Sequence, residues 1–236
     1  MRFMSDKNQF SKYAKSYNSY NIIQQLVAKS LVRELGYEPK RILELGCGSG
    51  QIYKYISWDV DFYHAIDASS SMCELHPKGK NIQVECFDFD SDVFFEALSN
   101  NTYDVVLSSS ALQWSANLPK IIEALSHVTS QVHAVLFTSN TFKTIQAISK
   151  KPSPILDEIS IKKAFSSYFE ATFETLNYQL EFDNKKELFD YIKKSGVSAS
   201  SSLDFKAAKE LYKEYPLNHL EFEVIFVKAK SRKTTI

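Results

Sequence analysis

A glycine-rich turn that directly follows an apolar run constrains the fold of this chain more than any other feature. Residues 42–50 read Ile-Leu-Glu-Leu-Gly-Cys-Gly-Ser-Gly. Glycines at alternate positions let the backbone turn sharply and approach a ligand closely, because no Cβ stands in the way. The run therefore predicts a buried strand over residues 41–45 that breaks into a ligand-binding turn.

Two acidic residues follow this turn at equal intervals. The spacing from Gly46 to Asp67 is the same as the spacing from Asp67 to Asp88. Each acidic residue stands just beyond an apolar run. In open α/β sheets, ligands bind at the carboxyl ends of parallel strands, so this layout predicts a nucleotide-type site at one edge of a sheet.

Apolar runs and helical patterns alternate from Arg41 to Thr138, which predicts a doubly wound, mostly parallel α/β sheet. The C-terminal third differs, because a final strand follows a loop and a short helix, which favours an antiparallel hairpin at the sheet edge. Ser195–Ser202 is rich in serine and is expected to form a loop, with a lid over the site as the alternative. The expected strands are 41–45, 63–66, 82–86, 103–108, 133–138, 172–182 and 221–230, and the expected helices are 8–35, 51–56, 69–75, 94–98, 118–127 and 185–194.

Length and composition favour one domain of ordinary globular character. The 236 residues contain no linker-like stretch, so we expect a single domain over 1–236. Within it we expect an N-terminal helical cap (1–38), a ligand-binding core (39–140) and a C-terminal part on the substrate side (141–230). Lys+Arg and Asp+Glu balance at 28 each, which argues against a whole-protein basic field for nucleic acid.

The sequence also favours a cytoplasmic protein without metal or disulfides. No apolar stretch approaches the ~18 residues of a membrane span, and the first residues lack the apolar core of a secretory signal. Three cysteines without a C-x-x-C pair make a disulfide framework unexpected. The five histidines show no paired spacing, so we expect no metal site.

The details of the glycine turn narrow the class of ligand. Gln51 stands where a dinucleotide fingerprint needs its third glycine, and a P-loop Lys-Ser/Thr pair is also missing. A ligand with a ribose but no pyrophosphate fits better. Asp67 is suited to the ribose hydroxyls, Asp88 to a purine amine and Phe89 to the ring face. The alternative for both carboxylates is simple helix capping.

The combined motifs resemble the class I S-adenosylmethionine-dependent methyltransferases over roughly residues 40–140. The segments that carry the resemblance are 43–50 (LELGCGSG), 66–72 (IDASSSM), 87–89 (FDF) and 103–108 (YDVVLS). The resemblance implies S-adenosylmethionine as cofactor. The sequence differs from the family pattern at residues 129–131, where Thr-Ser-Gln replaces the usual Pro-Gly-type turn. It also implies these roles: Glu44, Gly46 and Gly48 along the methionine part, Asp67 on the ribose, Ala68, Met72, Asp88 and Phe89 around the adenine, and the Ser108 carbonyl on its amino group.

The flanking segments are similar to the malonyl-[acyl-carrier protein] O-methyltransferase family of biotin synthesis. They are 10–17 (FSKYAKSY), 110–114 (SALQW), 193–197 (KKSGV) and 215–217 (YPL). This similarity implies methyl transfer to the free carboxylate of a malonyl group on acyl carrier protein. A carboxylate is ionised at neutral pH, so no general base is required. The implied pocket residues are Tyr17, which would also reach the cofactor, Gln113 and Trp114.

Several alternatives stay open. The acceptor can be another small carboxylic acid or metabolite, as in trans-aconitate methyltransferases, or the chain can bind the cofactor without catalysis. A nicotinamide-dependent oxidoreductase is disfavoured by Gln51. An acidic carrier protein would dock on a basic surface, whose alternative is an ordinary solvated face. The candidates for that surface are Lys143, Lys150, Lys151, Lys162 and Lys163.

Overall fold

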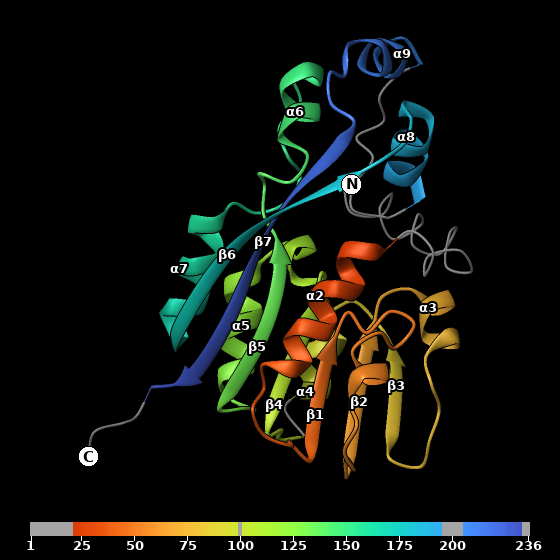
Figure 1. Ribbon diagram of the computed structural model, residues 1–236. Coiled ribbons are helices and arrows are strands. Elements are labelled where there is room, and N and C mark those ends of the chain that lie inside the picture. Colours follow the sequence, from red (N-terminus) through yellow and green to blue (C-terminus); the bar gives the residue numbers. More distant parts are fainter. Residues whose placement is uncertain (1–20, 99–100, 195–204, 233–236) are drawn as a thin grey trace.

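A single seven-stranded sheet organises the computed structural model, which describes residues 21–98, 101–194 and 205–232 (Figure 1). Its strand order is β3-β2-β1-β4-β5-β7-β6. The first five strands pair in parallel, whereas β7 runs antiparallel to both β5 and β6. The expected doubly wound sheet with an antiparallel C-terminal strand is confirmed. The strands are β1 (Arg41–Leu45), β2 (Phe62–Asp67), β3 (Ile82–Cys86), β4 (Val105–Ser109), β5 (Gln131–Phe137), β6 (Phe169–Glu181) and β7 (His219–Ser231).

Helices cover both faces of the sheet and create one apolar core on each side. Helix α2 (Ile22–Arg33) lies over β4 and β5 (Figure 1). Helices α5 (Leu118–Ser126) and α7 (Glu158–Tyr168) pack together, and α5 also contacts α4 (Asp92–Leu98). The central strands are buried on both faces, as expected for parallel strands between two helical layers.

The segment after the glycine turn differs from the expectation. The predicted helix over 51–56 is only a 3-10 turn, Tyr53–Tyr55. The Tyr53 ring packs edge-on against Tyr63 at 5.0 Å, and the indole Nε1 of Trp58 donates a hydrogen bond to the Pro39 carbonyl at 2.9 Å. These aromatic anchors hold the segment against the core, so tertiary packing overrides the local helical pattern.

The C-terminal hairpin extends beyond the carboxyl edge of the parallel strands (Figure 1). Strands β6 and β7 pair from Phe169↔Ser231 to Glu181↔His219, so both span 13 residues. Aromatic contacts tie neighbouring helices and loops to this end, because Phe222 packs against Phe142 at 5.0 Å and Tyr191 at 6.2 Å. The helices gathered here are α6 (Lys143–Ser149), α8 (Lys185–Lys194) and α9 (Phe205–Glu214).

Some expectations concern parts of the chain outside the described ranges. The expected helix over 8–35 is described only from Ile22 onward, and Ser195–Ser202 lies outside the described residues. Helices α6 and α7 are not among those that the sequence predicted. Over the described part of the chain, no helix combines the length and apolar character that a membrane crossing needs.

Candidate functional site

The glycine turn after β1 forms the floor of a pocket at the carboxyl edge of the sheet. Gly46, Gly48 and Gly50 all have positive φ angles, +72°, +52° and +81°. A Cβ on Gly46 would lie 2.1 Å from the Cβ of Ala111, whereas a Cβ on Gly48 would enter open space. Gly46 is therefore required for packing, and Gly48 presents bare backbone to the pocket.

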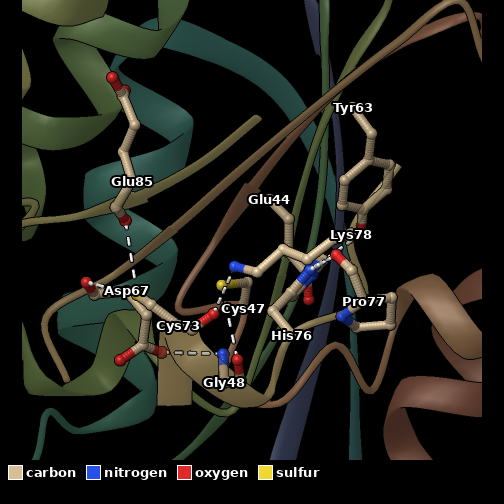
Figure 2. Close-up of polar contacts among 10 residues, drawn as sticks. All are labelled: Glu44, Cys47, Gly48, Tyr63, Asp67, Cys73, His76, Pro77, Lys78 and Glu85. Carbon is tan, nitrogen blue, oxygen red and sulfur yellow. Dashed lines mark hydrogen bonds and ion pairs between the residues drawn. The ribbon is translucent and has the colours of Figure 1, made fainter. Parts of the chain in front are cut away.

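Asp67 at the end of β2 fixes this turn from the side. Its Oδ2 accepts a hydrogen bond from the Gly48 N–H at 2.8 Å (Figure 2). Its Oδ1 accepts one from the Ser69 N–H at 2.8 Å. Burial raises the pKa of Asp67, and these two N–H donors oppose that shift. The carboxylate thus links the glycine turn to helix α3 (Ser70–Leu75), which carries Met72 into the pocket wall.

Glu44 is the most deeply buried acid of the pocket. Its residue is 1% exposed, and its carboxylate accepts a hydrogen bond from the Tyr63 hydroxyl. The Nε2 atom of His76 lies 3.9 Å from the same carboxylate oxygen (Figure 2). Burial raises the pKa of Glu44, while His76 and Tyr63 both act to lower it.

The turn after β4 forms the opposite wall. Ser110 adopts a left-handed backbone with φ +59°, which is uncommon for a residue with a Cβ and is often found at functional sites. Its N–H donates to the Val135 carbonyl at 2.8 Å, and its own carbonyl accepts from Gln113 Nε2 at 2.7 Å. These bonds hold the turn so that Ala111 and Trp114 face the glycine turn across the pocket.

Most of the residues expected to bind the cofactor or to line the acceptor pocket lie around this one pocket. Two do not line it: Ser108 is fully buried within β4, with its hydroxyl donating to the Leu45 carbonyl at 2.9 Å, and Gln113 lies behind Ser110. Tyr17 lies outside the described residues. The expected residues that line the pocket are Glu44, Gly46, Gly48, Asp67, Ala68, Met72, Asp88, Phe89 and Trp114.

Sequence reasoning missed several residues of the wall. Asn21, Gln24 and Ala28 come from the start of α2, and Ser109 and Ser110 stand where Ser108 was expected. The sequence held one signal for the α2 residues, because Gln24 is a polar residue within an otherwise apolar stripe of the helix. The structure shows that this face of α2 is buried. The two serines were missed because the strand was expected to end at residue 108, whereas β4 ends at Ser109.

The pocket carries negative charge. Glu44, Asp67 and Asp88 line it, and none of the described residues in its wall is Lys or Arg. Such a site suits a ligand with cationic groups and a ribose. Among the described residues, no group of three or more His, Cys, Asp or Glu side chains is placed to hold a metal ion.

Comparisons with known proteins agree with this geometry. A methyltransferase domain family matches residues 43–133. The malonyl-[acyl-carrier protein] O-methyltransferase of Bacillus anthracis is 31% identical over 177 residues, which cover 68% of this chain and 64% of that protein. This match thus spans just under two thirds of the relative's own length. The protein of the same name from Halalkalibacterium halodurans is 26% identical and covers 87% of this chain and 88% of its own length.

The fold is shared with solved methyltransferase structures. A putative methyltransferase of an antibiotic biosynthesis pathway from Anabaena variabilis superposes with a TM-score of 0.62 at 10% identity, covering 85% of this chain and 96% of that chain. Residues 43–133 of this chain therefore form a methyltransferase domain, and its glycine turn and sheet order indicate S-adenosylmethionine as the methyl donor.

Proposed function

We propose that this chain transfers a methyl group from S-adenosylmethionine to the free carboxylate of a malonyl thioester on acyl carrier protein, as in early biotin synthesis. The names of the curated relatives support this acceptor. The observation that carries the proposal is the acidic pocket on the glycine turn, which suits a sulfonium cofactor. The proposal treats residues 1–236 as one functional domain with an N-terminal cap, a cofactor core and a C-terminal substrate side, working in the cytoplasm.

The pocket walls provide groups for each part of the cofactor. Glu44 would face the ammonium of the methionine part, and the bare backbone of Gly46 and Gly48 would lie along it. Asp67 would accept hydrogen bonds from the ribose hydroxyls. Ala68, Met72, Asp88 and Phe89 would surround the adenine, with Ser109 and Ser110 closing the far edge.

The chemistry needs positioning more than proton transfer. S-Adenosylmethionine would supply the methyl group, so that an O–CH₃ bond would form at the malonyl carboxylate as the S–CH₃ bond breaks and S-adenosylhomocysteine leaves. Because the nucleophile is already ionised, the residues around it must exclude water and fix the approach. Trp114 and Gln113, with Tyr17, are proposed for that role; Gln113 would act by holding the Ser110 carbonyl at 2.7 Å.

The lysines proposed to dock the carrier lie in two separate places, at helix α6 and on helix α7. Helix α6 packs against α9 near the end of the hairpin, whereas α7 packs against α5 and β6 along the flank of the sheet (Figure 1). Lys143 already pairs with Glu221 at 3.5 Å, and Lys162 pairs with Glu158 at 2.6 Å. We therefore propose that the carrier uses the α6 side, with Lys150 at its end, because that side adjoins the carboxyl edge of the sheet.

An acceptor panel tests this function. Release of S-adenosylhomocysteine is measured with malonyl-loaded carrier protein, a small malonyl thioester, free malonate and trans-aconitate. The account predicts turnover on both malonyl thioesters, with the carrier form preferred. Turnover on trans-aconitate alone would favour the second candidate, a small-acid methyltransferase, and cofactor binding without any turnover would favour a non-catalytic module.

A further inference from the structure

We infer that His76 and Tyr63 act as positioning residues that keep the buried Glu44 carboxylate ionised and aimed at the cofactor. The inference rests on the proposed function only in its assignment of Glu44 to the methionine part. It concerns two side chains that stand behind the pocket and outside its wall. Figure 2 shows all three residues together.

The three side chains come from different elements and meet at one oxygen. Glu44 lies on β1, Tyr63 on the neighbouring β2 and His76 just after α3. The Tyr63 hydroxyl donates to Glu44 Oε2, and His76 Nε2 lies 3.9 Å from that same oxygen. The exposed fractions of Glu44, Tyr63 and His76 are 1%, 0% and 2%. Water therefore contributes little to stabilising the charge on this carboxylate.

The orientation of His76 is fixed by its other nitrogen. Nδ1 lies 2.9 Å from the Pro77 carbonyl, which can only accept, so Nδ1 carries a proton and donates it there. Nε2 then faces Glu44, is buried, and has no hydrogen-bond partner among the described residues. In this orientation the polar edge of the His76 ring faces the buried Glu44 carboxylate.

The same ring supports the glycine turn from below. A Cβ on Gly50 would lie 3.2 Å from Nε2 and Cδ2 of His76, so the turn rests against the imidazole. The ring also packs at 5.9 Å from Tyr53 and 6.1 Å from Tyr63. The His76 side chain therefore lies against both the glycine turn and the Glu44 carboxylate.

The electrostatic balance around Glu44 makes this support necessary. Burial and the nearby Asp67 carboxylate both raise the pKa of Glu44, and only His76 and Tyr63 oppose them. The described pocket wall has no Lys or Arg that could take over. Removal of His76 or Tyr63 would raise the pKa of Glu44 further, and a protonated Glu44 would attract a cofactor ammonium more weakly.

The test measures S-adenosylhomocysteine affinity by calorimetry between pH 5.5 and 8.5 for the full chain. His76→Phe and Tyr63→Phe keep an aromatic ring but remove the polar atom, and Tyr53→Phe is the matched control in the same aromatic cluster. We expect both test variants to bind at least about tenfold more weakly at pH 6 and to recover as the pH rises, since one pKa unit corresponds to a tenfold change in proton affinity. They should also release protons on binding, which the control does not.

Two results would overturn the inference. One is an affinity loss that is the same at every pH, which indicates lost packing alone; the other is a pH profile that matches the control. If His76→Phe fails to fold, Tyr63→Phe decides the question by the same profile. These binding measurements do not involve the methyl acceptor, so a failed acceptor panel leaves them interpretable. Failure of the parent protein to bind S-adenosylhomocysteine would instead contradict the proposed function.

Discussion

The carboxylate of Asp67 holds the backbone of Gly48 in place through a 2.8 Å hydrogen bond from the Gly48 N–H to Oδ2. The residue at the end of β2 therefore sets the shape of the turn after β1, before any ligand arrives. The two neighbouring strands reach the same edge of the sheet because they pair in parallel, with Leu45 opposite Ile66.

Replacement of this carboxylate is predicted to weaken cofactor binding strongly. Asp67→Ala removes the partner of Gly48 and Ser69 and the proposed ribose contact, and charged hydrogen bonds of this kind contribute about 1.5–3 kcal/mol. We expect an affinity loss of at least about tenfold in calorimetry with S-adenosylhomocysteine. Asp61→Ala, at an exposed site before β2, is the control. Unchanged affinity in Asp67→Ala would remove this residue from the site.

Two glycine substitutions separate backbone strain from steric clash. Gly36→Ala and Gly46→Ala both place a Cβ at a positive φ, +73° and +72°, which costs about 1–2 kcal/mol. Gly36 has no neighbour within 4 Å of the new Cβ, whereas Gly46 would meet Ala111 at 2.1 Å. We expect Gly36→Ala to lower the free energy of unfolding modestly and to bind cofactor normally.

Gly46→Ala should lose both stability and binding. Adding Ala111→Gly to Gly46→Ala removes the clashing Cβ and should restore part of the stability, because only the backbone strain then remains. Urea unfolding measures this recovery. If the double variant is no more stable than Gly46→Ala, the contact between the two turns is not what requires a glycine here.

A buried histidine in β5 is predicted to make stability pH-dependent. His133 is 4% exposed, and both ring nitrogens lack a hydrogen-bond partner among the described residues. Burial, with Lys228 and Lys230 nearby and only Glu34 opposing, lowers the pKa of His133 from 6.5 to about 4. The unfolded chain therefore takes up a proton below pH 6.5 that the folded chain binds only near pH 4, so stability falls as the pH drops through this window.

The loss from this one group amounts to about 3 kcal/mol at most by pH 4. His133→Leu should flatten the decline in urea midpoints between pH 6.5 and 4.5, whereas His127→Gln, at an exposed position, should leave it unchanged. Parallel declines in the parent and in His133→Leu would show that His133 binds protons equally in both states.

Single charge reversals on the two lysine-bearing helices test the docking side. Lys150 follows α6 and Lys163 lies on α7, and both are exposed. We expect Lys150→Glu to raise KM for the carrier-bound substrate several-fold while sparing a small malonyl thioester, because it weakens attraction to an acidic carrier. Lys163→Glu should change neither. Equal losses on both substrates, or a larger effect of Lys163→Glu, would contradict docking on the α6 side.

Local sequence signals predicted the part of the site that local geometry determines. Gly46, Gly48 and Asp67 belong to short motifs at strand ends, so their spacing predicted one edge of the sheet, and the structure brings them into one pocket. The helix expected around Tyr53–Tyr55 is only a short turn, because Tyr53 packs on a strand that follows later in the sequence. The contribution of α2 also depends on how that helix crosses the sheet, which the buried position of Gln24 does not by itself specify. His76 and Glu44 lie far apart in the sequence, so their meeting likewise depends on tertiary packing.

The methyl transfer itself is tested most directly by intact-mass spectrometry. Malonyl-loaded acyl carrier protein is incubated with this protein and S-adenosylmethionine, and a parallel sample omits the cofactor. The account predicts that the carrier gains the mass of one methyl group only in the complete reaction. An unchanged carrier mass, with cofactor binding intact, would contradict the account.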